Sequence, residues 1–217
     1  MKSQSTTQPP IILIHGLWFR AGFMRALARR LESAGFDVLP FNYHSTRQVL
    51  DLSAAQLGAF CAEQAADGAH LLGHSLGGLL ILRMLQQGGW NAPGRLLLLG
   101  TPLQGSAVAR RARTWPGMSR LFGHADEALS GGLQTWPQGR EVGMIAGTTP
   151  FGLGVFTGGL QRPNDGTVTV AETCDARLTA RLELPVTHTG MLYSKAVADA
   201  AVGFLREGRF REEERNW

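Results

Sequence analysis

The stretch Gly73-His74-Ser75-Leu76-Gly77 decides the fold of this 217-residue chain, because it joins two segments of opposite character. It follows the apolar run Ala69 to Leu72, typical of a buried strand, and opens the apolar segment Leu76 to Gln87, typical of a helix. A strand that turns abruptly into a helix strains its corner residue, and glycines two positions to either side keep side chains out of the turn. The pattern therefore predicts a sharp turn that lifts the Ser75 hydroxyl clear of a sheet.

Other short apolar runs alternate with segments of helical spacing, which is typical of a buried parallel sheet covered by helices. The runs predict strands at Ile11 to His15, Asp37 to Tyr43, Ala69 to His74, Arg95 to Gly100, Glu141 to Gly147 and Arg181 to Val186. The helical segments are Ala21 to Ala34, Gln48 to Ala65, Leu76 to Gln87 and Ala196 to Leu205. With right-handed crossovers, this order predicts an α/β fold: a mostly parallel sheet of about six or more strands with helices on both faces.

The length predicts a single domain over residues 1–217. Two segments break the alternation: Leu103 to Gly139, which is a lid or merely an extra helix pair, and the glycine-rich Thr149 to Pro163. We expect both above the carboxyl edge of the sheet, where open α/β sheets bind ligands. The highly charged end, 206–217, predicts a frayed tail.

Charge and cysteine usage argue against several functional classes. The net charge of +4 comes from scattered arginines without a nucleic-acid-binding module, so no nucleic-acid partner is expected. Cys61 and Cys174 lie in no metal-ligand spacing, which predicts two free thiols. The start, MKSQSTTQPP, has no apolar signal-peptide region, so we expect a cytoplasmic protein without membrane insertion; its oligomeric state is not indicated.

The motifs together resemble the lipase and esterase branch of the α/β-hydrolase superfamily. They comprise GHSLGG from Gly73, His15-Gly16 after the first strand, Thr101 to Ser106 after the fourth, and a late Asn164-Asp165-Gly166 and His188. The resemblance covers Ile11 to about Leu205. It implies an α/β-hydrolase fold in which Ser75 is the nucleophile.

A serine hydroxyl needs an imidazole to take its proton. The chain order of this fold places that histidine after the nucleophile, which leaves His124 and His188. His188 is favoured as the general base because it follows the last predicted strand in a loop at the carboxyl edge. His74 is expected to point away from Ser75 by the geometry of the turn.

The acid that orients the base is expected between Ser75 and His188. Asp165 is favoured because it follows the fifth strand, where the superfamily usually carries this residue. Asn-Asp-Gly is also one of the best turn sequences, so Asp165 has an ordinary structural interpretation as well. Asp175 and Glu172 are the alternatives.

The resemblance also implies an oxyanion hole and a pocket. Two backbone N–H groups, those of Leu17 and Leu76, would meet the charge that develops on the substrate oxygen. Aromatic and aliphatic side chains in the loops are candidates for an apolar pocket: Trp18, Leu103, Trp115, Phe151 and Phe156.

These features predict a serine hydrolase that cleaves small-molecule or lipid carboxylic esters through an acyl-Ser75 intermediate. This serine chemistry requires neither a metal nor a cofactor. Acyl transfer, thioester hydrolysis or amide hydrolysis would use the same three residues. A non-catalytic binding protein of the same fold is the alternative from another class. The length of the acyl chain is not readable from the sequence.

Overall fold

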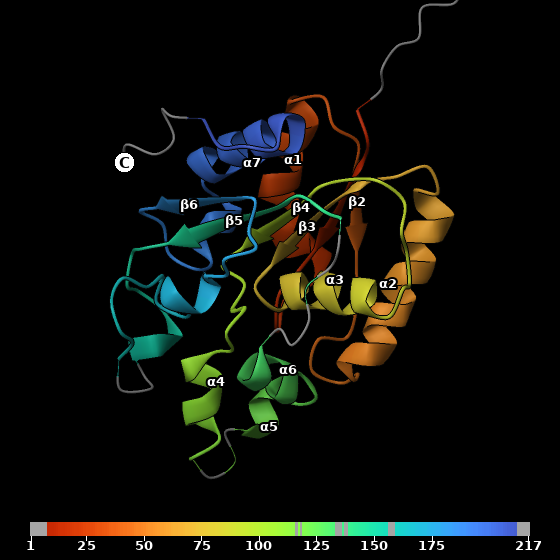
Figure 1. Cartoon of the computed structure of the whole chain (residues 1–217). Coiled ribbons are helices and arrows are strands. Elements are labelled where there is room, and N and C mark those ends of the chain that lie inside the picture. Colours follow the sequence, from red (N-terminus) through yellow and green to blue (C-terminus); the bar gives the residue numbers. More distant parts are fainter. Residues whose placement is uncertain are drawn as a thin grey trace, which may run out of the picture.

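The computed structural model describes residues 8–115, 117, 119–132, 136, 139–155 and 159–211. Its centre is a six-stranded sheet in which every paired strand is parallel, in the order β2-β1-β3-β4-β5-β6 (Figure 1). The predicted α/β class and parallel sheet are confirmed. Each strand overlaps one predicted run: β1 Ile11–Ile14, β2 Val38–Phe41, β3 His70–His74, β4 Leu96–Leu99, β5 Val142–Gly147 and β6 Ala180–Leu184.

The strand order reverses between β1 and β3, and this reversal positions the site. Ile11 pairs with Val38 of β2 on one side and with His70 of β3 on the other. The chain leaves β1 toward one edge of the sheet and leaves β3 toward the other edge. The loops after these two neighbouring strands therefore diverge at their carboxyl ends and leave a crevice between them.

Two pairs of helices cover the sheet (Figure 1). Helices α1 (Arg25–Ser33) and α7 (Lys195–Glu207) lie on one face, and α2 (Leu50–Gln64) and α3 (Leu76–Gln86) on the other. The first predicted helix begins differently, as a 3-10 turn, η1 (Ala21–Met24), in which Phe23 is 49% exposed. Within the described ranges, no helix combines the length and apolar character needed to cross a membrane.

Alternating strand residues feed two separate cores. Ile11 and Leu13 pack with α1 and α7, whereas Ile12 and Ile14 pack with α2 and α3. The same alternation runs through β4, where all four leucines are fully buried. Because both faces of the sheet are covered, β1 and β4 are apolar at every position, whereas the edge strand β6 alternates with the more exposed Arg181 and Glu183.

The segment 103–139 contains three short helices in its described part: α4 (Ala107–Ala112), α5 (Ser119–Phe122) and α6 (Ala125–Gly131). They gather at one end of the molecule (Figure 1), after the carboxyl end of β4. We call these helices the cap. The N–H of His124 donates a 3.1 Å hydrogen bond to the carbonyl of Thr46, which fastens the cap to the loop after β2.

The charged carboxyl-terminal segment begins later than expected. Helix α7 includes Arg206 and Glu207, and Phe210 is buried with its ring stacked at 5.3 Å on that of Phe204. The tail expected from residue 206 is therefore part of the packed fold up to Phe210, because an aromatic side chain holds it on the core. Residues 212–217 lie outside the described residues.

A buried histidine in the sheet makes stability depend on pH. His70 is 5% exposed, and its Nδ1 accepts a 3.0 Å hydrogen bond from the N–H of Arg95. Burial, and then the charge of Arg95, lower the pKa of this ring from 6.5 to about 4. The unfolded chain binds more protons between these values, so stability falls as the pH falls from 6.5 toward 4.

We expect His70 alone to lower the free energy of unfolding by about 2 kcal/mol between about pH 7.5 and about pH 5. In His70→Asn the amide oxygen takes the acceptor position of Nδ1 without titrating, so the variant should lose less stability over this range. Urea unfolding at both pH values measures the difference. The same pH dependence in both proteins would contradict a neutral, buried His70.

Candidate active site

The turn from β3 into α3 is as crowded as its sequence predicts. Ser75 has φ 54° and ψ −121°, a left-handed conformation that non-glycine residues rarely adopt. A Cβ on Gly73 would lie 2.6 Å from the backbone of α3, and a Cβ on Gly77 would lie 2.5 Å from the carbonyl oxygen of Ile14. The N–H of Ser75 donates a 2.8 Å hydrogen bond to the carbonyl of Leu99, which ties the corner to β4.

Asp165 and His188 form a buried pair. Nδ1 of His188 lies 2.6 Å from Oδ2 of Asp165, and the two residues are 7% and 1% exposed. The other carboxylate oxygen, Oδ1, accepts hydrogen bonds from the N–H groups of Thr167 and Val168 at 2.9 and 2.7 Å. The N–H of His188 donates to the Asp165 carbonyl at 2.8 Å. Asp165 thus both closes its own turn and holds the imidazole.

Gly100, the residue after β4, leaves the room for this pair. A Cβ there would lie 3.1 Å from both Asp165 Oδ2 and His188 Nδ1, and the residue has φ +55°. Any side chain would press on the hydrogen bond between the acid and the imidazole. The sequence indicates only that Gly100 ends a strand, because the two partners come from loops far along the chain.

His74, which was expected to point away from Ser75, lies beside the favoured base: its ring centroid is 4.7 Å from that of His188. The residue is also among those that line the cavity shared with Ser75. Nε2 of His74 lies 3.0 Å from the carbonyl oxygen of His188. Burial, and then the nearby His188, lower the pKa of His74 well below its usual value, so the ring is neutral.

The loop after β1 approaches the same corner. A Cβ on Gly16 would lie 3.1 Å from Cβ of Ser75. Trp18 has φ 61° and is, with Ser75, one of two non-glycine residues with positive φ in the described part of the chain. Its N–H donates a 3.0 Å hydrogen bond to Oγ of Ser45. Two strained backbone positions therefore adjoin one cavity, as is common at functional sites.

The two expected oxyanion-hole residues lie in the loop after β1 and in the turn from β3 into α3. Leu17 lines the cavity, and Leu76 is the first residue of α3, where a helix has no internal partner for the N–H group. Beneath the loop, the Tyr43 hydroxyl donates a 3.0 Å hydrogen bond to the His15 carbonyl, and the two rings stack at 4.5 Å. His15 is fully buried and supports the loop from below.

The cavity that these residues share has a volume of about 540 Å³. No Lys, Arg, Asp or Glu stands among the described residues that line it. The cap contributes Val108, Phe122 and Leu129, which the sequence analysis did not assign to a pocket. The full set is Leu17, Trp18, Phe19, His74, Ser75, Pro102, Ser106, Val108, Phe122, Leu129, Phe151, Gly152, Leu153, Thr167, Val168, Thr187, His188 and Thr189.

The pocket candidates are only partly brought together. Trp18 and Phe151 line the cavity, but Leu103 is 1% exposed and belongs to the core on the α2 and α3 face. Trp115 follows the end of α4, is 47% exposed and is not among the lining residues. Both corrections have one cause: apolar character does not tell a core or surface position from a lining one. Phe156 lies outside the described residues.

The alternative acids are engaged elsewhere. Oε1 of Glu172 accepts a 2.5 Å hydrogen bond from the N–H of Ala107, the first residue of α4, and Oε2 accepts one of 2.7 Å from the N–H of Thr169. The Glu172 carboxylate thus binds the amino-terminal end of helix α4. Asp175 forms a 2.7 Å ion pair with Arg177, which lowers the pKa of its carboxyl.

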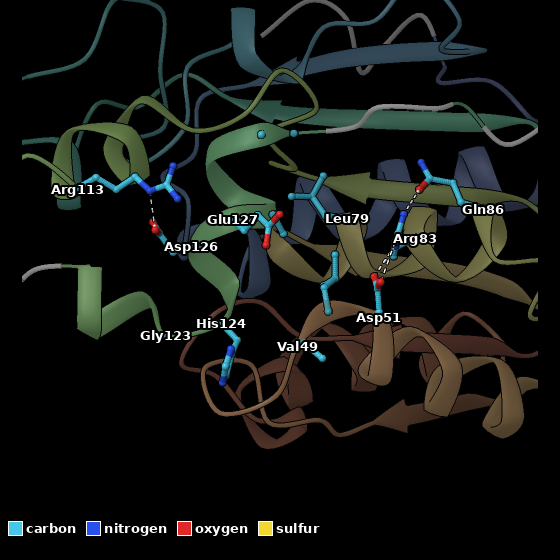
Figure 2. Close-up of a pocket in the computed structure, with 14 residues that line it drawn as sticks. Val49, Asp51, Leu79, Arg83, Gln86, Arg113, Gly123, His124, Asp126 and Glu127 are labelled. Carbon is cyan, nitrogen blue, oxygen red and sulfur yellow. Dashed lines mark hydrogen bonds and ion pairs between the residues drawn. The ribbon is translucent and has the colours of Figure 1, made fainter.

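His124, the alternative base, lines a different cavity of about 620 Å³ between α6 and the helices α2 and α3 (Figure 2). That cavity holds two ion pairs, Arg83 with Asp51 at 2.6 Å and Arg113 with Asp126 at 2.7 Å. It lacks Ser75 and His188. Among the described residues, no three His, Cys, Asp or Glu side chains are grouped to hold a metal ion.

Comparisons with known proteins concern the family and the fold of the chain. The model of the alpha/beta hydrolase family matches residues 11–205, whereas no curated protein matches significantly. The fold is similar to the mature form of the Bacillus licheniformis lipase BlEst2, with a TM-score of 0.78, 21% identity, and 96% and 95% of the two chains covered.

Two other solved structures are similar in fold. The RedJ thioesterase of prodiginine biosynthesis in Streptomyces coelicolor has a TM-score of 0.60 and 14% identity, with 94% of this chain and 91% of that chain covered. A pyrethroid hydrolase from Sphingobium faniae JZ-2 has a TM-score of 0.58 and 17% identity, with 92% and 98% covered.

The crowding at Gly100 can be tested against Gly88, which has φ +67° and open space around it. Gly100→Ala and Gly88→Ala should each lose about 1–2 kcal/mol of unfolding free energy, because both place a Cβ on a left-handed residue. Only Gly100→Ala should shift or broaden the downfield NMR signal of the His188 Nδ1 proton, assigned by its loss in His188→Ala. An unchanged signal would show that the pair tolerates the added methyl group.

Proposed function

Because the chain belongs to the alpha/beta hydrolase family, we propose that it is a serine hydrolase that cleaves neutral carboxylic esters with an apolar acyl group. The observation that carries the proposal is the buried pair of Asp165 and His188, at 2.6 Å, in a cavity shared with Ser75. A carboxylate that holds one imidazole nitrogen leaves the other nitrogen to accept the proton of a serine hydroxyl.

In the proposed reaction, Oγ of Ser75 attacks the ester carbonyl while Nε2 of His188 takes the hydroxyl proton. The N–H groups of Leu17 and Leu76 stabilise the negative charge on the former carbonyl oxygen. The C–O bond to the alcohol breaks, and the alcohol leaves with the proton from His188. Water then attacks the acyl-Ser75 with His188 again as base, which releases the acid and restores the serine.

Asp165 suits the orienting role because its two carboxylate oxygens have separate tasks. Oδ1 accepts the N–H groups of Thr167 and Val168, and Oδ2 accepts Nδ1–H of His188. The charge of the carboxylate is thereby supported in a buried place, where an unsupported charge would be costly. A fixed carboxylate keeps the imidazole in the tautomer that presents a free Nε2 to Ser75.

The lining of the cavity supports a neutral, apolar acyl group. Trp18, Phe122 and Phe151 contribute rings, and no residue of opposite charge stands among the described lining to receive an anionic chain. A volume of about 540 Å³ lies within the ordinary range for small organic ligands, roughly 300–1,000 Å³. These features favour esters with an uncharged acyl group over esters whose acyl group carries a charge.

We expect a fluorophosphonate probe to label wild-type protein once, at Ser75, and not to label Ser75→Ala. Asp165→Asn should slow labelling by about 10³-fold to 10⁴-fold, because the amide no longer holds the reactive tautomer. The matched control is Asp175→Asn, which removes the ion pair of a half-buried carboxylate with the exposed Arg177 and should keep the wild-type rate. Mass spectrometry of the labelled peptide measures both. A folded wild-type protein that takes no label would refute a serine nucleophile.

The apolar cavity predicts discrimination by charge at constant acyl length. We expect kcat/KM for 4-nitrophenyl butyrate to exceed that for 4-nitrophenyl hemisuccinate by about 100-fold, because the succinyl carboxylate would be buried without a partner. Initial rates of 4-nitrophenol release measure the ratio. Equal rates would contradict an uncharged acyl site, and faster turnover of the butyryl thioester or amide would replace the ester by that substrate class.

A further inference from the structure

His74 is a buried histidine next to Ser75 that the proposed reaction does not use. It is 1% exposed, and it comes from the last position of β3. Its ring lies between that of Phe19, stacked at 5.9 Å, and that of His188, tilted at 4.7 Å. An apolar side chain would fill this place at a lower desolvation cost, so the polar edge of the ring calls for a role.

The hydrogen bond of His74 has one direction. A carbonyl oxygen only accepts, so Nε2 of His74 carries the hydrogen and donates it to the His188 carbonyl at 3.0 Å. Nδ1 of His74 is buried without a hydrogen-bond partner in the described structure, and a Cβ on Gly16 would lie 3.0 Å from it. A proton on Nδ1 would have no acceptor there, and it would add a positive charge beside His188.

His188 is consequently held at three places. Its ring Nδ1 and its backbone N–H are both bonded to Asp165, at 2.6 and 2.8 Å. Those two bonds join the histidine loop to the Asp165 turn, but they do not connect either of them to the strand that carries Ser75. The third bond, from His74, makes that connection across 114 positions of the chain.

We propose that His74 is a positioning residue: its ring, by donating Nε2–H to the His188 carbonyl, sets the place of the His188 imidazole relative to Ser75. This inference rests on the proposed function, in which His188 takes the proton of Ser75. A displacement of about 1 Å in such a pair is enough to lower a rate by about 100-fold. The bond acts on the proton transfer, so its loss lowers kcat more than it changes KM.

Three substitutions of His74 distinguish the effect of its hydrogen bond from the effect of the volume that its ring fills. In His74→Gln the terminal amide nitrogen takes the place of Nε2 and keeps the donor. In His74→Asn the shorter side chain brings its amide only to the place of Nδ1. His74→Phe keeps a ring against Phe19 but has no donor.

We expect His74→Gln to keep kcat for 4-nitrophenyl butyrate within about 5-fold of wild type, and His74→Asn and His74→Phe to lower it by about 10-fold to 100-fold at nearly constant KM. The downfield NMR signal of the His188 Nδ1 proton should persist in the Gln variant and broaden or shift in the other two. Circular dichroism and urea unfolding establish that each variant is folded. If the Gln variant does not fold, the Phe variant and its NMR signal carry the comparison.

The outcomes are distinct. The positioning role would be overturned if His74→Asn and His74→Phe kept the wild-type kcat. It would also be overturned if the Gln and Asn variants lost kcat equally while the NMR signal stayed unchanged. Either result would leave the proposed function intact. A folded wild-type protein that neither hydrolyses the ester nor takes the fluorophosphonate would overturn the proposed function, and this inference with it.

Discussion

The close approach of the β3 to α3 turn to its neighbours is the constraint on which the rest of the structure depends. Ser75 is held at φ 54°, and the glycines on either side lie where a Cβ would meet backbone at 2.6 and 2.5 Å. This closeness lets α3 begin directly above β1, so the start of the helix, the loop after β1 and Ser75 share one corner. The corner lies at the reversal of strand order, where an open parallel sheet has its crevice.

The second half of the site comes from two loops that lie far from that corner along the chain. The Asp165 turn follows β5, and the His188 loop follows β6; they bind each other through a side chain and a backbone hydrogen bond. Each has hydrogen bonds within its own turn, but the cavity that they share with Ser75 depends on the order in which the strands pair. The bond between His74 and the His188 carbonyl joins the two halves directly.

The cap adjoins two cavities of opposite character. Around Ser75, the cap presents Val108, Phe122 and Leu129, and the described lining has no Lys, Arg, Asp or Glu. On its other side, between α6 and the helices α2 and α3, the cavity is lined by ion pairs (Figure 2). The cap residues Arg113, Asp126 and Glu127 thus line the second cavity and not the apolar one, where a buried charge without a partner would be costly.

Much of the architecture follows from the sequence because it depends on local chemistry. Continuous apolar runs specify strands covered on both faces, and the glycine spacing around Ser75 specifies the turn. Asn164-Asp165-Gly166 specifies a turn that offers a carboxylate. The local pattern did not determine the contacts between distant segments. It did not predict that His74 contacts His188, or that Gly100 lies against the acid and the imidazole. It also did not predict that Phe122 of the cap lines the cavity and that Trp115 does not. Hydrophobic periodicity tells which face of an element is buried; only the pairing order of the strands and the packing of the loops decide which residue it is buried against.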